Sequence, residues 1–442
     1  MKKLLFAALL AMVLAAGLAA QQPPQPIDDA ERRAVVAAAA DALSKQYVFP
    51  DVARKMGDLI RRNLKSGQYQ ALTDPPAFAE RLTADLRSIS RDRHLGVRFA
   101  PERILEIRTP DEAKKKAAEE FQKKRNRMAN HGFQEIKLLE GNVGYLKFNF
   151  FSADPESFPV AVGAMAFLAN CDALIIDLRE NGGGNPEMIQ LLSSYFFDGE
   201  PKHLNSFYYR LGEKTEQYWT QVYVPGVRRP YLDLYVLTSG MTFSGAEEFT
   251  YNLKNMKRAT IVGETTGGGA HPQRMEILSD RFAMSIPFAR AVNPVSGTNW
   301  EGTGIEPDVK VPAAQALDKA LGLALEKLAG REKDERIQKG YQWALDRIQA
   351  EMNPVTLAAE LLKSYAGGYG PRKIVFEDGA LYYQRGEGAK MRMIPMSEDL
   401  FRFAEIEYFR LKIVKADGRV TGVEGRYNDG SSDFNALDRN DE

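Results

Sequence analysis

The region from residue 91 to residue 330 alternates between short apolar runs and amphipathic stretches, and this alternation limits the fold more than any other feature. Four runs are predicted strands because they are short, apolar and rich in β-branched residues. They are "VGYLKFNFF", "ALIIDL", "LDLYVLTS" and "ATIVGE". Predicted helices lie at 155–169, 186–197, 244–257 and 312–329. Strands and helices in alternation predict an α/β core, here 91–330, with a largely parallel sheet.

Other patterns flank this core. Residues 27–90 contain three amphipathic stretches separated by "VFPD" and "DPP", which predicts a small helical module. The charged run 111–128 mixes both signs and predicts a solvated helix rather than a binding patch. After a helical linker at 331–353, residues 354–442 alternate with period two between Asp-Gly turns. That pattern predicts a separate antiparallel β domain.

The first twenty residues carry a Lys pair, an apolar stretch and then small residues. This pattern predicts a signal peptide over 1–20, cleaved near Ala19 or Ala20, and therefore export to a periplasm or the outside. The apolar stretch is short for a bilayer span, so we expect no stable membrane insertion after cleavage. Cys171 is the only cysteine, so no intramolecular disulfide can form, and its apolar neighbours predict burial.

Composition excludes several classes of function. The 442 residues are 44% hydrophobic and 27% charged, which is enough for a large core and two or three domains. The 59 basic and 59 acidic residues balance, so no basic field for nucleic acid is expected. The sequence shows no His, Cys and carboxylate spacing typical of a metal site, and we expect neither a metal nor an organic cofactor.

Two glycine-rich turns follow predicted strands. In "ALIIDLRENGGGNP", glycines 182–184 precede a helix that begins at Pro186. Glycines let the chain turn sharply and expose N–H groups at a helix start, which suits an anion or a developing oxyanion. Neither the dinucleotide fingerprint nor a P-loop is present, so phosphate binding is disfavoured.

The second turn is "TSGMTFSGAEEF", residues 238–249, which places Ser244 at a helix start directly after a strand. A serine there presents its Oγ beside unpaired N–H groups, as a nucleophile requires. It is also a common helix N-cap, and alone the pattern favours that ordinary role. A nucleophilic serine also needs a base, and only four histidines are available, of which the first and last lie in loops beside predicted strands. They are His94, His131, His203 and His271.

Four motifs in order resemble the tail-specific, or C-terminal-processing, serine peptidases: "GYLKFNFF", "ALIIDLRENGGGN", "VLTSGMTFSGAEEF" and "IVGETTGGG". The resemblance covers roughly 27–320 and is closest to the subgroup with the interphotoreceptor retinoid-binding protein repeats and the tricorn protease core. It implies a crotonase/ClpP-like α/β core after a three-helix module. The last domain resembles small lipocalin-like β modules. Residues 95–140 are too few for the PDZ domain of many family members, so the resemblance does not by itself imply tail specificity.

The resemblance implies a role for Ser244 as the nucleophile, three residues before Glu247. Tail-specific members use a lysine base, but Gly269 stands at that position here. The tricorn-like arrangement instead implies His94 as the base and Glu301 as its orienting carboxylate, with Glu306 as the less favoured alternative.

Further roles follow from the same resemblance. The oxyanion hole would use the backbone N–H of Gly245 and of one glycine within 182–184, for which Gly183 is the candidate. His271 is a candidate for the substrate pocket or for a substitute base, ranked behind His94. Arg93 replaces the serine that precedes the tricorn histidine, which places a four-member relay in doubt.

These inferences predict an exported serine endopeptidase that hydrolyses peptides or unfolded protein segments through an acyl-enzyme. One alternative is a non-catalytic carrier of retinoid-like or fatty-acid-like ligands, against which a complete Ser/His/Glu set argues. Another is a crotonase-type acyl-CoA enzyme, which export from the cytoplasm disfavours. Fold alone does not decide among them.

Overall fold

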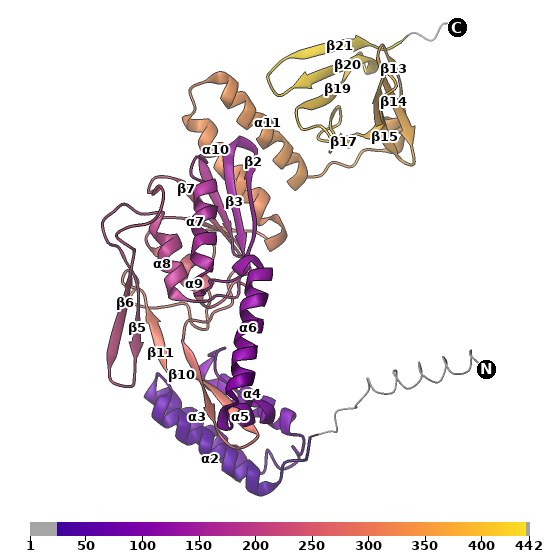
Figure 1. The fold of residues 1–442 in the computed structure, drawn as a ribbon. Coiled ribbons are helices and arrows are strands. Elements are labelled where there is room, and N and C mark those ends of the chain that lie inside the picture. Colours follow the sequence, from indigo (N-terminus) through magenta and orange to yellow (C-terminus); the bar gives the residue numbers. More distant parts are fainter. Residues whose placement is uncertain (1–23, 439–442) are drawn as a thin grey trace, which may run out of the picture. The chain divides into compact units, whose positions relative to one another are not determined.

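The computed structural model describes residues 24–438, which divide into two compact units (Figure 1). Unit 1 takes in the chain up to Ala117 together with Phe207–Thr215 and His271–Arg290, and unit 2 takes in the rest. The predicted signal peptide lies outside the described residues. Within 24–438, no helix has both the length and the apolar character needed to cross a membrane.

Unit 1 contains the three helices predicted near the N-terminus: α2 (Asp29–Gln46), α3 (Pro50–Lys65) and α4 (Pro75–Ser90). The side chains of Asp28 and Asp74 cap α2 and α4 by accepting backbone N–H bonds, and prolines begin α3 and α4. The helices pack on an antiparallel sheet, β1-β10-β9, through a shared apolar core. The remaining elements of unit 1 are β1 (Gly96–Phe99), β9 (Gln273–Ile277), β10 (Phe282–Pro287) and α5 (Pro101–Arg108).

Unit 2 is built on a six-stranded sheet of order β12-β8-β7-β4-β3-β2. Five strands are parallel, and β2 pairs antiparallel with β3 at the edge. The four strands predicted from the sequence are all present. The strands are β2 (Phe133–Leu139), β3 (Val143–Phe148), β4 (Ala173–Asp177), β7 (Asp233–Thr238), β8 (Thr260–Gly263) and β12 (Val309–Lys310).

Helices cover both faces of this sheet, which explains why its strands are apolar throughout. Leu174 and Ile176 of β4 point into a core with α7, α8 and α9, while Ile175 points into a core with α10 and α11. The predicted helices are confirmed: α7 (Ser157–Phe167), α8 (Pro186–Ser194), α9 (Gly245–Asn255), α10 (Ala316–Arg331) and α11 (Glu335–Met352). Cys171 is buried in the first of these cores, as expected.

The C-terminal part of unit 2 is antiparallel β structure, as the period-two pattern predicts. Two sheets, β13-β14-β15-β16 and β17-β18-β19-β20-β21, enclose an aromatic-rich core. The Asp378-Gly379 and Asp417-Gly418 turns have positive φ at both residues, as tight hairpins require. The elements are α12 (Ala359–Lys363), β13 (Gly367–Tyr369), β14 (Arg372–Glu377), β15 (Ala380–Arg385), β16 (Met391–Arg392), β17 (Ile394–Pro395), β18 (Leu400–Arg402), β19 (Phe409–Ala416), β20 (Arg419–Tyr427) and β21 (Ser432–Ala436).

A few segments carry the chain between the units. The charged helix α6 (Glu112–Met128) has no buried residue, which confirms the prediction of a solvated helix. The strands β5 (His203–Tyr209), β6 (Lys214–Trp219) and β11 (Ala289–Val292) each run through a boundary of the two units. The names crotonase-like and lipocalin-like, and the predicted domain boundaries, stay predictions; the fold described is mixed α/β with several sheets.

Candidate active site

Ser244 lies in the turn between β7 and α9 and has an unusual backbone conformation. Its φ is 53° and its ψ is −120°, although it carries a side chain. A non-glycine residue at positive φ outside the small left-handed region is strained by about 1–3 kcal/mol, and such strain gathers at functional sites. An ordinary N-cap has extended backbone angles instead. The conformation therefore separates Ser244 from a plain capping serine.

The carboxylate of Glu247 holds this turn in place. Its Oε2 accepts the backbone N–H of Ser244 at 2.9 Å and that of Gly269 at 2.8 Å, while its Oε1 accepts the N–H of Gly268 at 2.6 Å and the hydroxyl of Thr266. Glu247 is fully buried, and burial raises its pKa, although these hydrogen bonds oppose the shift. One side chain thus joins the serine turn to the glycine-rich loop 264–270.

The first glycine-rich turn lies directly against Ser244. A Cβ on Gly183 would stand 2.8 Å from the Cβ of Ser244 and 2.7 Å from the backbone N of Gly245. A Cβ on Gly184 would stand 2.1 Å from the carbonyl O of Phe151. Gly183 and Gly184 have φ of +107° and +138°, so the close approach requires glycine at both positions. The N–H of Gly183 donates to Asn181 Oδ1 at 2.9 Å.

Glu301 lies beside the glycine-rich loop within unit 2. Its Oε2 accepts the backbone N–H of Ala270 at 2.6 Å, and the neighbouring Trp300 donates its indole N–H to the carbonyl O of Gly269. The carboxylate is half-buried, whereas Glu306 is exposed. Hydrogen bonds therefore connect Ser244 to Glu301 through Glu247 and the loop.

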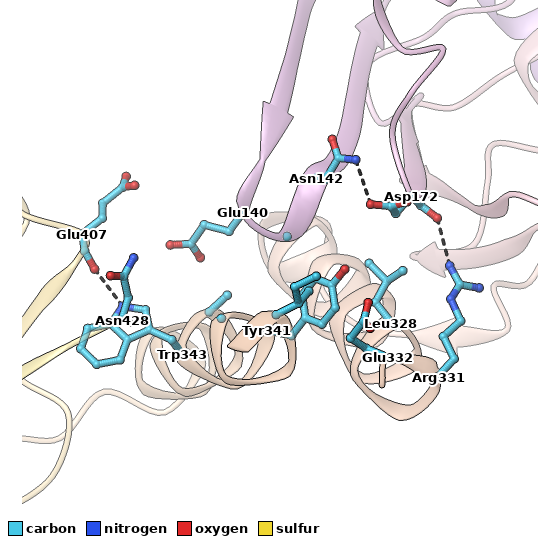
Figure 2. Close-up of a pocket in the computed structure, with 14 residues that line it drawn as sticks. Glu140, Asn142, Asp172, Leu328, Arg331, Glu332, Tyr341, Trp343, Glu407 and Asn428 are labelled. Carbon is cyan, nitrogen blue, oxygen red and sulfur yellow. Dashed lines mark hydrogen bonds between the residues drawn. The ribbon is translucent and has the colours of Figure 1, made fainter. Parts of the chain in front are cut away.

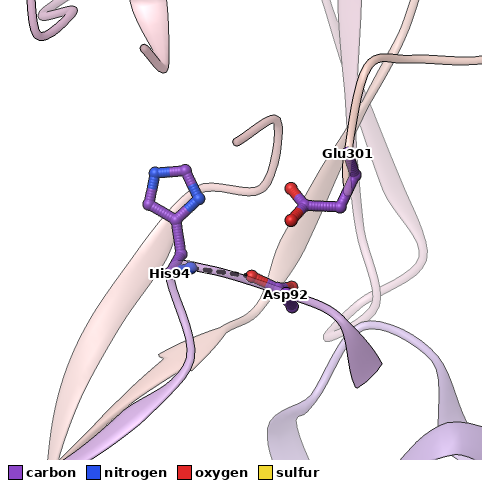
Figure 3. A group of neighbouring side chains, drawn as sticks. All are labelled: Asp92, His94 and Glu301. Carbon is purple, nitrogen blue, oxygen red and sulfur yellow. Dashed lines mark hydrogen bonds between the residues drawn. The ribbon is translucent and has the colours of Figure 1, made fainter. Parts of the chain in front are cut away.

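The two singled-out histidines lie in unit 1 around one buried carboxylate. His271 Nδ1 is 2.7 Å from Asp92 Oδ2, and the exposed fractions of the two side chains are 3% and 0%. Asp92 Oδ1 accepts the backbone N–H of His94 at 3.0 Å, the dashed line in Figure 3. Tyr47 donates its hydroxyl to Asp92 Oδ2 at 3.3 Å. Asp92 therefore contacts both histidine-bearing segments.

His94 lies in the loop just before β1, and burial lowers the pKa of its imidazole. The charge of Asp92 opposes this shift, whereas His271, Arg87 and Arg93 reinforce it. A lowered pKa keeps the ring neutral near neutral pH, which is the state that can accept a proton.

The predicted site residues thus fall into two groups. Unit 2 gathers Ser244, Gly245, Gly183 and Glu301, and unit 1 gathers His94 and His271. Sequence reasoning missed Asp92 as a partner of His271, because 179 positions separate them and no local pattern links them. The other two histidines lie elsewhere in unit 2: His131 near Asp154, and His203 stacked on Trp219.

A cavity of about 600 Å³ in unit 2 lies apart from these residues (Figure 2). Its lining includes Glu140, Asp172 and Tyr341, and it shares no residue with the Ser244 turn. Trp343 donates its indole N–H to the carbonyl O of Glu407 at this cavity and thereby ties α11 to the C-terminal β structure.

Two family models match parts of the chain. Residues 142–311 match the model of peptidase family S41, and residues 29–131 match the N-terminal domain of peptidase S41 in eukaryotic IRBP. The chain belongs to peptidase family S41, the tail-specific or C-terminal-processing serine peptidases. The second match also agrees with the retinoid-binding-protein type of N-terminal module expected from the sequence.

Individual relatives are more distant. The chain is 27% identical over 177 residues to carboxyl-terminal-processing peptidase 2, chloroplastic, of Arabidopsis thaliana, covering 38% of this chain and 32% of the relative. It is 27% identical over 186 residues to a carboxy-terminal-processing protease of Bartonella bacilliformis, covering 39% of each. The chain thus spans about a third of the length of these curated relatives. Among solved structures, the photosystem II D1 C-terminal processing protease matches with a TM-score of 0.41, at 16% identity, over 64% of this chain and 93% of that one.

Proposed function

We propose that the protein is an exported serine endopeptidase that cleaves peptides or unfolded protein segments. The observation that carries this proposal is the strained conformation of Ser244, whose backbone N–H is bound by Glu247 and whose Cβ lies close to Gly183. A nucleophile at a sharp turn between strand and helix exposes its Oγ beside backbone N–H donors. Membership of family S41 supports peptide-bond hydrolysis as the reaction, and the first twenty residues support export.

The proposed reaction uses three side chains. Ser244 Oγ attacks the scissile carbonyl carbon while His94 takes its proton, and collapse of the tetrahedral intermediate breaks the C–N bond as His94 protonates the leaving amine. His94 then takes a proton from a water molecule that attacks the acyl carbon, and it returns this proton to Ser244 Oγ as the ester bond breaks and the acid leaves. Glu301 would orient His94. A positioned base contributes about 10²- to 10⁴-fold to the rate.

The backbone N–H groups of Gly245 and Gly183 would bind the developing oxyanion. Each such donor contributes about 2.7–4 kcal/mol of transition-state stabilisation. The N–H of Gly183 donates to the Asn181 side chain in the free protein, so the oxyanion would replace that amide oxygen as its acceptor. His271 remains the candidate for a substrate-contacting residue.

A fluorophosphonate probe tests the proposal directly, because it reacts only with an activated serine. We expect the purified mature protein to be labelled at Ser244, and Ser244→Ala to abolish labelling without loss of folding. His94→Ala should also abolish labelling, whereas full labelling of His94→Ala but not of His271→Ala would move the base role to His271. A folded wild-type protein that is not labelled would contradict the proposal. Tight binding of a retinoid or fatty acid in that case would favour the carrier, which the comparisons do not favour.

A further inference from the structure

One carboxylate in unit 1 contacts both histidines, and its position suggests a function. Asp92 Oδ2 meets the ring of His271, and Asp92 Oδ1 meets the backbone of His94. We propose that Asp92 is a positioning residue that holds His271 as the Nδ1–H tautomer and fixes the turn that carries His94. This inference rests on the proposed function and adds to it the residue that sets the protonation pattern of the site.

Packing leaves the His271 ring little freedom to turn. The rings of His271 and Phe49 meet edge to face with their centroids 5.5 Å apart. The guanidinium of Arg290 lies over the Phe49 ring, 5.4 Å from its centroid. The side chains of His271 and Asp92 are both almost fully buried. A buried ring fixed by an aromatic neighbour and one short hydrogen bond keeps one orientation.

The chemistry of the partner then determines the tautomer. An ionised carboxylate can only accept hydrogen bonds, so His271 Nδ1, at 2.7 Å from Asp92, must carry the proton. In the neutral ring, Nε2 is consequently an acceptor.

Replacing Asp92 by asparagine should reverse this pattern. Asparagine has one acceptor oxygen and one NH₂ donor. The backbone N–H of His94 needs the oxygen, because it cannot accept a hydrogen bond. The NH₂ group then faces His271 Nδ1, which must accept and lose its proton to Nε2. Tyr47 can tolerate either partner because a hydroxyl both donates and accepts.

The tautomer can be measured without any substrate. With only four histidines, ¹⁵N-histidine labelling gives a simple spectrum, and the loss of signals in His271→Gln assigns the ring. We expect a protonated Nδ1 and an unprotonated Nε2 in the wild type, the reverse in Asp92→Asn, and the wild-type pattern in the control Tyr47→Phe. A protonated Nε2 in the neutral wild-type ring would overturn the proposal, even if Asp92→Asn failed to fold.

The rate of fluorophosphonate labelling tests the role in the reaction. We expect Asp92→Asn to label several-fold more slowly, because it removes the charge that raises the pKa of the proposed base His94 and so makes that base weaker. Tyr47→Phe should stay within about twofold of the wild type. A reversed tautomer with an unchanged labelling rate would overturn the positioning role. If the wild type were not labelled, the proposed function would fail, while the spectrum would still decide whether Asp92 sets the tautomer.

Discussion

Glu247 in unit 2 and Asp92 in unit 1 are both fully buried carboxylates, but they hold different kinds of group. Glu247 accepts three backbone N–H bonds and one hydroxyl. Asp92 accepts one backbone N–H, one tyrosine hydroxyl and one imidazole. Most partners of the first carboxylate are backbone N–H groups, whereas most partners of the second are side chains.

The difference matters because backbone N–H groups do not titrate, whereas an imidazole can move or lose its proton. Glu247 can therefore fix only geometry: the strained turn of Ser244 and the loop that carries Gly268 and Gly269. Asp92 can fix both geometry and protonation. We expect changes around Glu247 to appear in stability, and changes around Asp92 to appear in pH dependence.

Among substitutions near the Ser244 turn in unit 2, we expect Gly184→Ala to lower stability most. Alanine there would place its Cβ 2.1 Å from the carbonyl O of Phe151, at a φ of +138°. We expect the free energy of unfolding to fall by about 4 kcal/mol or more, measured by urea denaturation. Gly182→Ala is the control, because no atom lies within 4 Å of its added Cβ. Equal losses in the two variants would show that crowding does not shape this turn.

Glu247→Gln should have the next largest effect. Glutamine keeps the size of the side chain but turns one acceptor oxygen into a donor, which leaves at least one buried backbone N–H without a partner. Such a group costs about 1–3 kcal/mol, and we expect a loss of about 2–3 kcal/mol in the free energy of unfolding. Glu306→Gln, at an exposed carboxyl, should change it by about 0.5 kcal/mol or less. An unchanged free energy of unfolding in Glu247→Gln would show that the hydrogen bonds of Glu247 do not stabilise this turn.

The same contrast explains what the sequence could predict. The four inner strands β8, β7, β4 and β3 of the six-stranded sheet, the longer helices and the glycine turns were predictable, because each depends on local periodicity or on residues a few positions apart. Ser244 was predictable as a candidate because its turn is local: the strand, the bend and Glu247 lie within one short motif. Its strained φ, which separates it from an N-cap, is visible only in the structure.

The contacts of Asp92 with Tyr47 and His271 in unit 1 were not predictable in the same way. Asp92 pairs with Tyr47 across 45 positions and with His271 across 179. The strands β9 and β10, which belong to the sheet of unit 1, follow the parallel core in sequence and were not recognised. Long-range pairs of this kind depend on the fold as a whole, so single residues such as His271 could be noted but not given a partner.

Glu248 sharpens the comparison because it is the sequence neighbour of Glu247. Burial raises the pKa of Glu248 to about 8; the neighbouring amide of Asn205 opposes the shift and the charge of Glu187 adds to it. Because the folded pKa lies above the ordinary value of 4.5, the stability that this carboxyl contributes is present below pH 4.5 and is lost as pH rises through about 8. Glutamine does not titrate, so the melting temperature of Glu248→Gln, relative to that of the wild type, should rise as the pH is raised from about 5 to about 9. A constant difference across this range would show that Glu248 does not titrate there.

The smallest effect concerns the pH dependence at His94. Burial holds the pKa of His94 below 6.5, so the rate of Ser244 labelling should fall on the acid side with a midpoint below pH 6.5. Around this ring, the charge of Asp92 raises the pKa, while His271, Arg87 and Arg93 lower it. Asp92→Asn removes the raising charge and should move the midpoint further down.

This shift separates an electrostatic role from a merely structural one. A variant that only loosens the fold lowers the labelling rate by the same factor at every pH and leaves the midpoint in place. Loss of a charge that stabilises the imidazolium of His94 moves the midpoint downward, whatever happens to the maximal rate. An unmoved midpoint in a folded Asp92→Asn protein would therefore assign Asp92 to the same class as Glu247, as a carboxylate that fixes geometry alone.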